Sequence, residues 1–198
     1  MKNKVLMGLA AIAMVAVLSS CGKKPQVEID ATNAAIEAAK TAEAPVYVPA
    51  EFAAVQDSMA AINADIAAQE SKLFKKFGPA KLKLAETLTL ANKVAADAAV
   101  KKQEVKKEVE TLITDVKAVI EENTALLKKA PRGKEGAAVL EQMKTEMATI
   151  EASVVEAQGL YDKGAFMDAL NKVKAAKERA TGINTELKDA IAKVKGRK

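Results

Sequence analysis

The chain has 198 residues, of which 31 are Lys or Arg and 26 are Asp or Glu, so its formal net charge at pH 7 is +5. It contains no histidine, no tryptophan and one cysteine. The commonest general base and metal ligand is therefore absent, no two thiols can pair, and few rings are present for stacking on bases. We expect a protein that is not an enzyme, uses no metal or cofactor and binds no nucleic acid. Paired carboxylates for hydrolysis are a catalytic arrangement that this composition leaves open.

Residues 1–20 have the organisation of an export signal. Two lysines precede an apolar run from Val5 to Leu18, which is shorter than the roughly 20 residues that a membrane-spanning helix needs. The sequence Leu18-Ser19-Ser20-Cys21 resembles the lipobox of bacterial lipoproteins, in which the cysteine is acylated and becomes the first residue of the mature chain. We therefore expect a lipoprotein signal peptide that is removed and a lipid on Cys21. An ordinary signal or anchor with an incidental cysteine is the alternative.

Residues 21–25 read Cys-Gly-Lys-Lys-Pro and form a short tether, so the folded part begins close to the anchor. Position 22 holds glycine and not aspartate, the residue that marks inner-membrane retention in enteric bacteria. By this resemblance we expect a protein of the outer membrane that faces the periplasm. Lys2 and Lys4 leave with the signal, so basic residues then exceed acidic ones by three. That small and interspersed excess does not indicate a nucleic-acid-binding surface.

The remainder, residues 26–198, is predicted to be one all-α domain. Few glycines and prolines interrupt it, and between them apolar residues recur at alternating spacings of three and four, which is typical of helices that pack along a narrow seam. One helix has no internal breaker for about 50 residues and exceeds its neighbours in length. We expect an elongated antiparallel bundle or coiled-coil rod around this very long central helix. The predicted helices span about 26–43, 49–77, 79–129, 137–162 and 165–195.

The apolar seam can be given for each of the four longer helices. The first of them carries Phe52, Val55, Met59, Ile62, Ile66 and Leu73. The long helix carries Leu84, Leu88, Ala91, Ala95, Ala98, Val105, Val109, Leu112, Val116, Val119 and Leu126, with a second stripe at Ile113, Ile120 and Leu127. The last two carry Leu140, Met143, Met147, Ile150, Val154, Ala157 and Tyr161, and then Phe166, Ala169, Val173, Ala176, Ala180, Ile183, Leu187, Ala190 and Val194. Two polar residues, Lys102 and Asn123, occupy positions of this register.

The helix boundaries have recognisable turn chemistry. Pro49 and Pro79 suit the first turn of a helix, where the missing N–H has no intrahelical partner in any case. Gly78 and Gly164 are predicted to adopt the left-handed conformation that ends a helix.

The segment Ala44-Pro45-Val46-Tyr47-Val48-Pro49-Ala50-Glu51-Phe52 follows an alanine-rich stretch. Its Tyr-x-Pro-x-Glu-hydrophobic motif resembles a family of small bacterial envelope lipoproteins with an uncharacterised helical domain, over roughly residues 31–99. A later glycine-to-aromatic signature of that family is altered here to Phe77-Gly78-Pro79. The resemblance implies a class and a location, and no reaction. The motif also has a purely structural interpretation, in which the tyrosine ring is buried at a turn, proline starts a helix and Glu51 favours the positive end of the helix dipole.

These observations favour a membrane-anchored, non-enzymatic scaffold, spacer or protein-interaction module that contacts partner proteins of the envelope. The alternative is a periplasmic chaperone-like lipoprotein, with Met143 and Met147 supplying an adaptable client-binding surface. Both methionines also fit the core of the bundle.

The last two residues, Arg197-Lys198, resemble the end of the murein-linked lipoprotein of enteric bacteria, whose terminal lysine is joined to peptidoglycan. The resemblance implies peptidoglycan attachment at Lys198. The simpler interpretation is that basic residues near a helix C-terminus complement its dipole and stay solvated.

Overall fold

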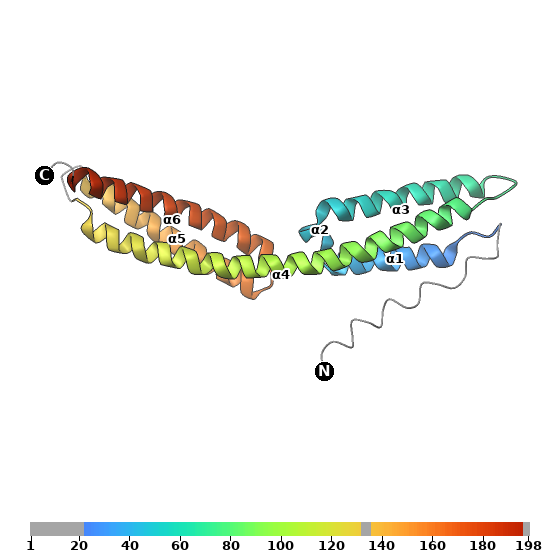
Figure 1. Ribbon diagram of the computed structural model, residues 1–198, viewed down its shortest axis with the longest axis horizontal. Helices are drawn as coiled ribbons and strands as arrows, with labels where there is room; N and C mark the ends of the chain where they lie inside the picture. The colour runs from blue at the N-terminus through green and yellow to red at the C-terminus, as the bar shows by residue number, and fades with distance from the viewer. Residues whose placement is uncertain (1–21, 132–135, 196–198) are drawn as a thin grey trace, which may run out of the picture. The chain divides into compact units, whose positions relative to one another are not determined.

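The computed structural model describes residues 22–131 and 136–195, which fold into six helices and no strand (Figure 1). The fold is therefore all-α, with one long central helix, as the sequence predicts. This helix, α4, has 52 residues, which corresponds to a contour of about 78 Å at 1.5 Å per residue. In chain order the helices are α1 (Gln26–Thr41), α2 (Ala44–Tyr47), α3 (Pro49–Glu70), α4 (Gly78–Lys129), α5 (Gly136–Asp162) and α6 (Phe166–Lys195).

The contacts divide the described chain into two compact units. Unit 1 contains residues 22–41 and 50–95, which form α1, α3 and the first part of α4. Unit 2 contains residues 42–49 and 96–195, which form α2, the rest of α4, α5 and α6. Where the sequence pattern predicts one domain, two units arise because α4 is longer than any of its partners, and different helices pack on its two parts.

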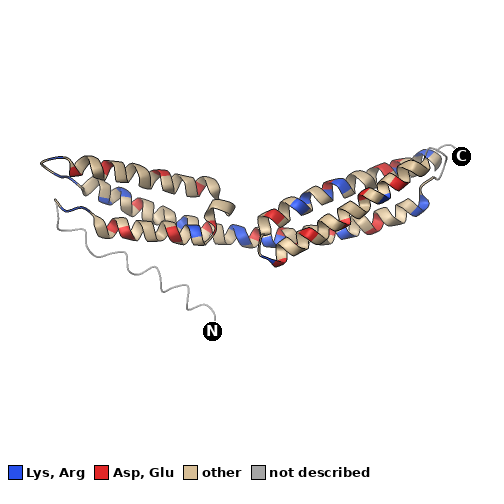
Figure 2. Ribbon diagram, turned by 180° about the vertical axis from the view of Figure 1, so that it is seen from behind, with Lys and Arg blue, Asp and Glu red and all other residues tan. Residues whose placement is uncertain are grey.

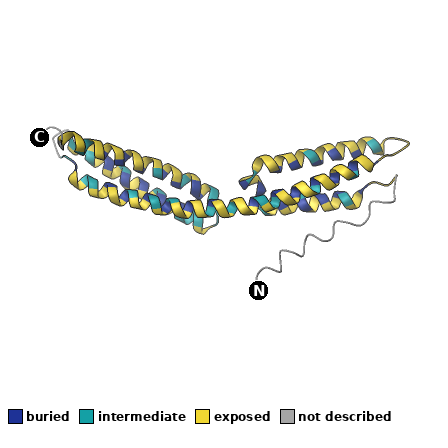
Figure 3. Cartoon of the chain, viewed as in Figure 1, coloured by how far each residue is buried: buried dark blue, intermediate teal, exposed yellow. Residues whose placement is uncertain are grey.

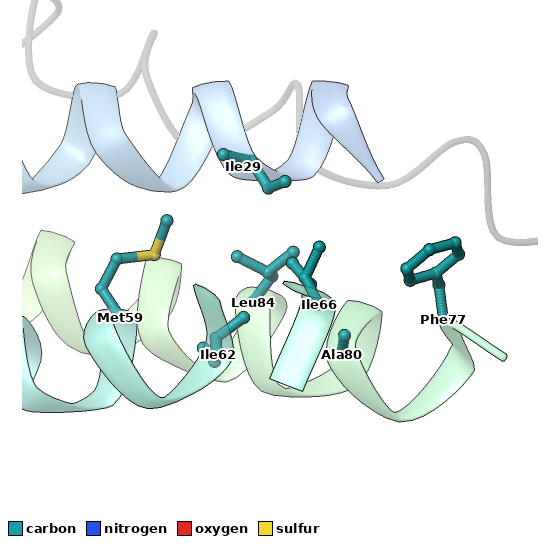
Figure 4. Close-up of a cluster of buried hydrophobic side chains, with 7 residues drawn as sticks. All are labelled: Ile29, Met59, Ile62, Ile66, Phe77, Ala80 and Leu84. Carbon is teal, nitrogen blue, oxygen red and sulfur yellow. The ribbon is translucent and has the colours of Figure 1, made fainter. Parts of the chain in front are cut away.

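The core of unit 1 follows the predicted seam of α3. Phe52, Val55, Met59, Ile62 and Ile66 are all buried, which confirms the three-and-four spacing for this helix. Part of this seam meets residues of α1, of α4 and of the loop before α4 in a cluster (Figure 4) composed of Ile29, Met59, Ile62, Ile66, Phe77, Ala80 and Leu84. Burial of one large apolar side chain contributes roughly 1.5–3 kcal/mol, so this cluster is a major source of the unit's stability.

One polar side chain also joins α1 to α4 inside unit 1. Thr32 is fully buried, and its Oγ1 lies 2.8 Å from the carbonyl oxygen of Glu28 and 3.3 Å from that of Leu84. The hydroxyl thus finds acceptors on its own helix and on the neighbouring one, so its burial leaves no polar atom without a partner.

Unit 2 has a three-helix core of α4, α5 and α6, and Figure 3 shows its buried residues along the facing sides of these helices. Both stripes predicted on α4 contribute, as Val109 and Val116 are fully buried and Ile113 and Ile120 are nearly so. From α5 and α6 the seam residues Met143, Met147, Ile150, Val154, Ala157, Ala169, Val173, Ala176, Ala180, Ile183 and Leu187 are buried as predicted.

The turn between α5 and α6 is formed as the sequence predicts. Gly164 has φ 80°, in the left-handed region. Its N–H donates to the carbonyl of Tyr161, and the N–H of Ala165 donates to that of Leu160. These two bonds satisfy carbonyls at the end of α5 in the Schellman arrangement, and they return the chain for α6 to pack on α5.

Several predicted boundaries are wrong. The helix predicted to reach residue 77 ends at Glu70, and Leu73 is 90% exposed instead of lying in the seam. The cause is local: Gln69 Oε1 accepts a bond from the N–H of Lys76 at 3.3 Å, which folds the loop back on the helix end. At the far end of α6, Val194 is 42% exposed, so the seam stops earlier than its spacing predicts.

The connection between the first two predicted helices also differs. α1 ends at Thr41, and the residues up to Pro49 contain the short helix α2. Gly78 does not adopt the left-handed conformation but is the first residue of α4. Among the described non-glycine residues, Glu43 alone has a positive φ, of 61°, and this reverses the chain before α2. A side chain in this region costs about 1–2 kcal/mol, which the surrounding contacts must offset.

Candidate functional site

The two predicted attachment residues, Cys21 and Lys198, lie outside the described residues. The tether next to Cys21 is described from Gly22 onward, and Lys23 and Lys24 are exposed. Lys24 Nζ lies 3.2 Å from Glu70 Oε1, so the tether lies against the end of α3. The chain that follows the predicted acylation site is therefore held on unit 1.

The loop between α3 and α4 lies beside this tether. Leu73 is 90% and Phe74 80% exposed, whereas Phe77, three residues later, is 1% exposed and packs in the core of unit 1. A shallow hollow is lined by Gly22, Leu73, Phe74, Lys75 and Lys76, which places the loop next to the tether. Apolar side chains this exposed are informative when they occur together rather than singly.

The same loop is basic. It reads Ser-Lys-Leu-Phe-Lys-Lys-Phe over residues 71–77, and Lys72, Lys75 and Lys76 are all exposed. In the described part of the chain, none of these three lysines forms an ion pair, whereas the nearby carboxylate of Glu70 is paired with Lys24. We name residues 72–76 the basic–apolar loop. The apolar register does not predict this loop, because Leu73 fits the seam. The signal for it in the sequence is the pair of apolar residues between lysines.

A second group of charged and aromatic side chains joins the four helices of unit 2. Lys102, the polar residue in the seam of α4, has its Nζ 2.9 Å from Glu43 Oε2. The same Nζ lies 5.9 Å from the ring centre of Tyr47 and 6.0 Å from that of Phe166. Lys106 lies 5.9 Å from the rings of Tyr161 and Phe166. We name these residues, with Glu110, the Lys102 cluster: Glu43, Tyr47, Lys102, Lys106, Glu110, Tyr161 and Phe166.

The contacts of the Lys102 cluster account for its members without a ligand. An ammonium within about 6 Å of an aromatic ring is attracted by roughly 0.5–1 kcal/mol at exposed sites and by more when desolvated. Tyr161 and Phe166 also pack with ring centres 5.2 Å apart. Because Glu43 pairs with Lys102, the left-handed residue before α2 is fixed to α4. The Tyr-x-Pro-x-Glu motif thus has the structural role anticipated for it: Tyr47 is buried, Pro49 begins α3, and Glu51 lies in its first turn.

Both tyrosines of the chain are in this cluster, and both have altered acidity. The hydroxyl of Tyr161 donates a hydrogen bond to Glu110 Oε1, which raises the pKa of Tyr161 to about 12. Burial raises the pKa of Tyr47, and the charge of Glu43 adds to the effect while Lys102 opposes it. In each case the neutral phenol is the favoured form, as expected for a hydrogen-bonded or desolvated hydroxyl.

The other polar residue in the α4 seam, Asn123, is fully buried in unit 2. Its Nδ2 donates to the carbonyl of Ala180 at 2.7 Å, and its Oδ1 accepts a bond from Asn184 Nδ2 at 2.8 Å. Near this pair, hydrogen bonds from Lys188 and Asn184 lower the pKa of Glu122 against the opposing effect of desolvation. A buried amide pair of this kind fixes the register between two helices, because a shifted register would leave its polar atoms without partners.

Charges of both signs alternate along the outer faces of the helices (Figure 2). Many form ion pairs between neighbouring helices, such as Lys81 with Glu28 and Lys177 with Asp115. Desolvation acts to raise the pKa of Glu28, but the hydrogen bond and charge of Lys81, with a backbone hydrogen bond, give a net lowering. Exposed pairs of this type contribute at most about 1 kcal/mol each, so they add little to the stability of the fold.

Met143 and Met147, on which the client-binding alternative depends, are 7% and 4% exposed. Met147 borders a shallow hollow that Leu127, Lys144 and Glu151 also line. The two methionines therefore pack in the core of unit 2 and do not form an open apolar surface.

Among the described residues, no cluster of three or more His, Cys, Asp or Glu residues is arranged to bind a metal ion. No described helix combines the length and the hydropathy needed to cross a membrane. The fold thus defines an all-α protein whose charged, aromatic and amide groups mainly join helices to one another. Comparison with protein-family models, with curated proteins and with solved structures finds no match for the chain.

Proposed function

We propose that the protein is a lipid-anchored component of the bacterial envelope that acts by contact, as a non-enzymatic scaffold or spacer. The observation that carries the proposal is the N-terminal pattern of two lysines, an apolar run and Leu18-Ser19-Ser20-Cys21, which contains the single cysteine of the chain. The single thiol of the chain lies at the end of this signal, and its simplest chemical role there is to accept a lipid. The glycine that follows favours the outer membrane as the destination, with the folded part in the periplasm.

The arrangement of the helices supports a role in contact rather than in chemistry. The buried polar side chains Thr32, Asn123 and Asn184 bond across to neighbouring helices. The titratable groups with altered pKa, such as Tyr161 and Glu122, owe the change to partners that also join helices. These groups therefore stabilise the packing that a scaffold needs, and the exposed charged faces remain for partner proteins.

The attachment is tested with Cys21→Ser in the native bacterium, using an alkyne-tagged fatty acid and cell fractionation. We expect the wild-type protein to incorporate the tag and to sediment with membranes. The Cys21→Ser protein should incorporate none, because a hydroxyl does not replace the thiol in the acyl transfer, and it should remain unprocessed or become soluble. Ser20→Ala is the matched control, since it keeps a small residue before the cysteine. Equal labelling of Cys21→Ser and wild type would overturn the proposal.

The scaffold role is tested by crosslinking intact cells and isolating the acylated protein. We expect discrete crosslinked species that contain this protein and envelope proteins. These species should be lost when the charged residues on the outer helix faces are altered. They should remain in Met147→Leu, which changes a buried residue and conserves its volume. Recovery of many unrelated unfolded proteins would instead favour the client-binding alternative.

A further inference from the structure

Within the described residues, the basic–apolar loop brings two large exposed apolar side chains together with three lysines that form no ion pair. The fold buries Phe77 but leaves Leu73 and Phe74 in solvent, although the two phenylalanines are three residues apart. Water exposure of these side chains is unfavourable, so a surface that covers them would gain free energy from the contact.

The loop is held in a defined position. The N–H of Lys76 donates to Gln69 Oε1, the N–H of Lys72 donates to the Gln69 carbonyl at 3.1 Å, and Ser71 Oγ donates to the Ala68 carbonyl at 2.9 Å. Together with the burial of Phe77, these bonds fix both ends of the loop. Leu73 and Phe74 are therefore presented outward by the fold.

The loop also lies beside the start of the described tether. Gly22, the next residue after Cys21, lines the same hollow as Leu73 and Phe74. Figure 1 shows the start of α1 and the α3–α4 loop at the same end of unit 1. Val27, in the first turn of α1, is 80% exposed and adds an apolar side chain near this end.

We propose that the basic–apolar loop is a second membrane contact beside the lipid anchor. Leu73 and Phe74 enter the boundary between headgroups and acyl chains, and Lys72, Lys75 and Lys76 bind the phosphates of anionic phospholipids. This inference rests on the proposed acylation of Cys21, which brings the loop to a membrane surface. An apolar insertion flanked by basic residues is the combination that binds peripheral proteins to anionic membranes. Each lysine near such a surface strengthens binding about fivefold, so three contribute on the order of a hundredfold.

The absence of tryptophan from the chain allows a direct test. The variant Phe74→Trp places a single indole in the loop, and Val155→Trp places one on α5, at a residue that is 71% exposed. Each acylated protein is purified from membranes and reconstituted on vesicles with brominated acyl chains. The vesicles are made of phosphatidylcholine alone or of equal parts phosphatidylcholine and phosphatidylglycerol. Flotation reports the lipid anchor, and quenching of the indole reports the position of the loop.

We expect both variants to float with both kinds of vesicle. The indole of Phe74→Trp should shift to shorter emission wavelength and be quenched severalfold more than that of Val155→Trp, with stronger quenching on the anionic vesicles. Adding Lys72→Gln, Lys75→Gln and Lys76→Gln to Phe74→Trp should remove the preference for phosphatidylglycerol.

The outcomes separate the two proposals. Failure of the proteins to float contradicts the lipid anchor. Flotation without quenching of Phe74→Trp contradicts the loop contact while the anchor stands. In that case the exposed loop serves a protein partner instead.

Discussion

At the scale of single residues, Lys102 and Asn123 join α4 to chain segments about 60 residues away, through an ion pair with Glu43 and a hydrogen bond from Asn184. Lys102 and Asn123 are visible as polar interruptions of an apolar seam. Their partners, Glu43 for Lys102 and Asn184 for Asn123, are remote in the chain and lie outside α4, so no local spacing predicts the pairing. For Leu73 the register predicts burial and the residue is exposed. A residue that continues the register can lie outside the helix when a side-chain hydrogen bond has ended the helix before it.

The tyrosines give a residue-scale prediction. Because the folded-state pKa of Tyr161 is raised to about 12, its bond to Glu110 stabilises the fold fully below about pH 10. That contribution is lost as the pH rises from about 10 to about 12, where the phenol ionises even in the folded state. Tyr47 also has a raised pKa, so both tyrosines of the chain should titrate late.

The measurement is tyrosinate absorbance against pH, which no tryptophan obscures. At about pH 10, where half of ordinary phenols are ionised, the folded protein should show clearly less tyrosinate than the urea-unfolded protein. Tyr161→Phe should remove the component that titrates near pH 12. A folded protein whose two phenols both titrate near pH 10 would show that the Lys102 cluster is not formed as described.

At the scale of helices, the apolar register predicts which faces are buried better than it predicts where helices end. The seams of α3, α5 and most of α6 lie at the predicted residues because a repeated three-and-four spacing leaves a helix only one face to bury. The ends of α1 and α3 depend on single interactions, such as the left-handed backbone of Glu43 and the bond from Lys76 to Gln69. The basic–apolar loop depends on the hydrogen bond from Lys76 to Gln69, which the apolar register does not predict.

Two adjacent valines of α5 test the register. Val154 is 3% exposed and Val155 is 71% exposed. We expect Val154→Asp to reduce the free energy of unfolding by about 3 kcal/mol or more, since it buries a carboxylate with no partner. Val155→Asp should change it by about 0.5 kcal/mol or less. Both variants replace valine by aspartate in the same helix, so the change in helix propensity cancels when their free energies of unfolding are compared.

The free energies come from urea unfolding followed by circular dichroism. Similar midpoints for Val154→Asp and Val155→Asp would mean that α5 presents a different face to α4 and α6.

At the scale of the whole molecule, the sequence predicts an all-α chain with one dominant helix, and the structure confirms this. It does not predict that the contacts separate into two units, because no glycine or proline interrupts α4 after its first turn. The division has a functional consequence: the tether and the basic–apolar loop, which are the two proposed sites of membrane contact, both belong to unit 1. The Lys102 cluster and the buried amide pair belong to unit 2, where they stabilise the helices that we propose for contact with partners.

The central claim is that a lipid on Cys21 attaches the protein to a membrane, and it is tested most directly by mass spectrometry of the protein isolated from bacterial membranes. After trypsin digestion, the account predicts an N-terminal peptide that begins at Cys21, ends at Lys23 and carries the added mass of fatty acyl groups. Residues 1–20 should be missing from the isolated protein. An N-terminal peptide that still contains these residues, or one that begins at Cys21 with no added lipid mass, would contradict the account.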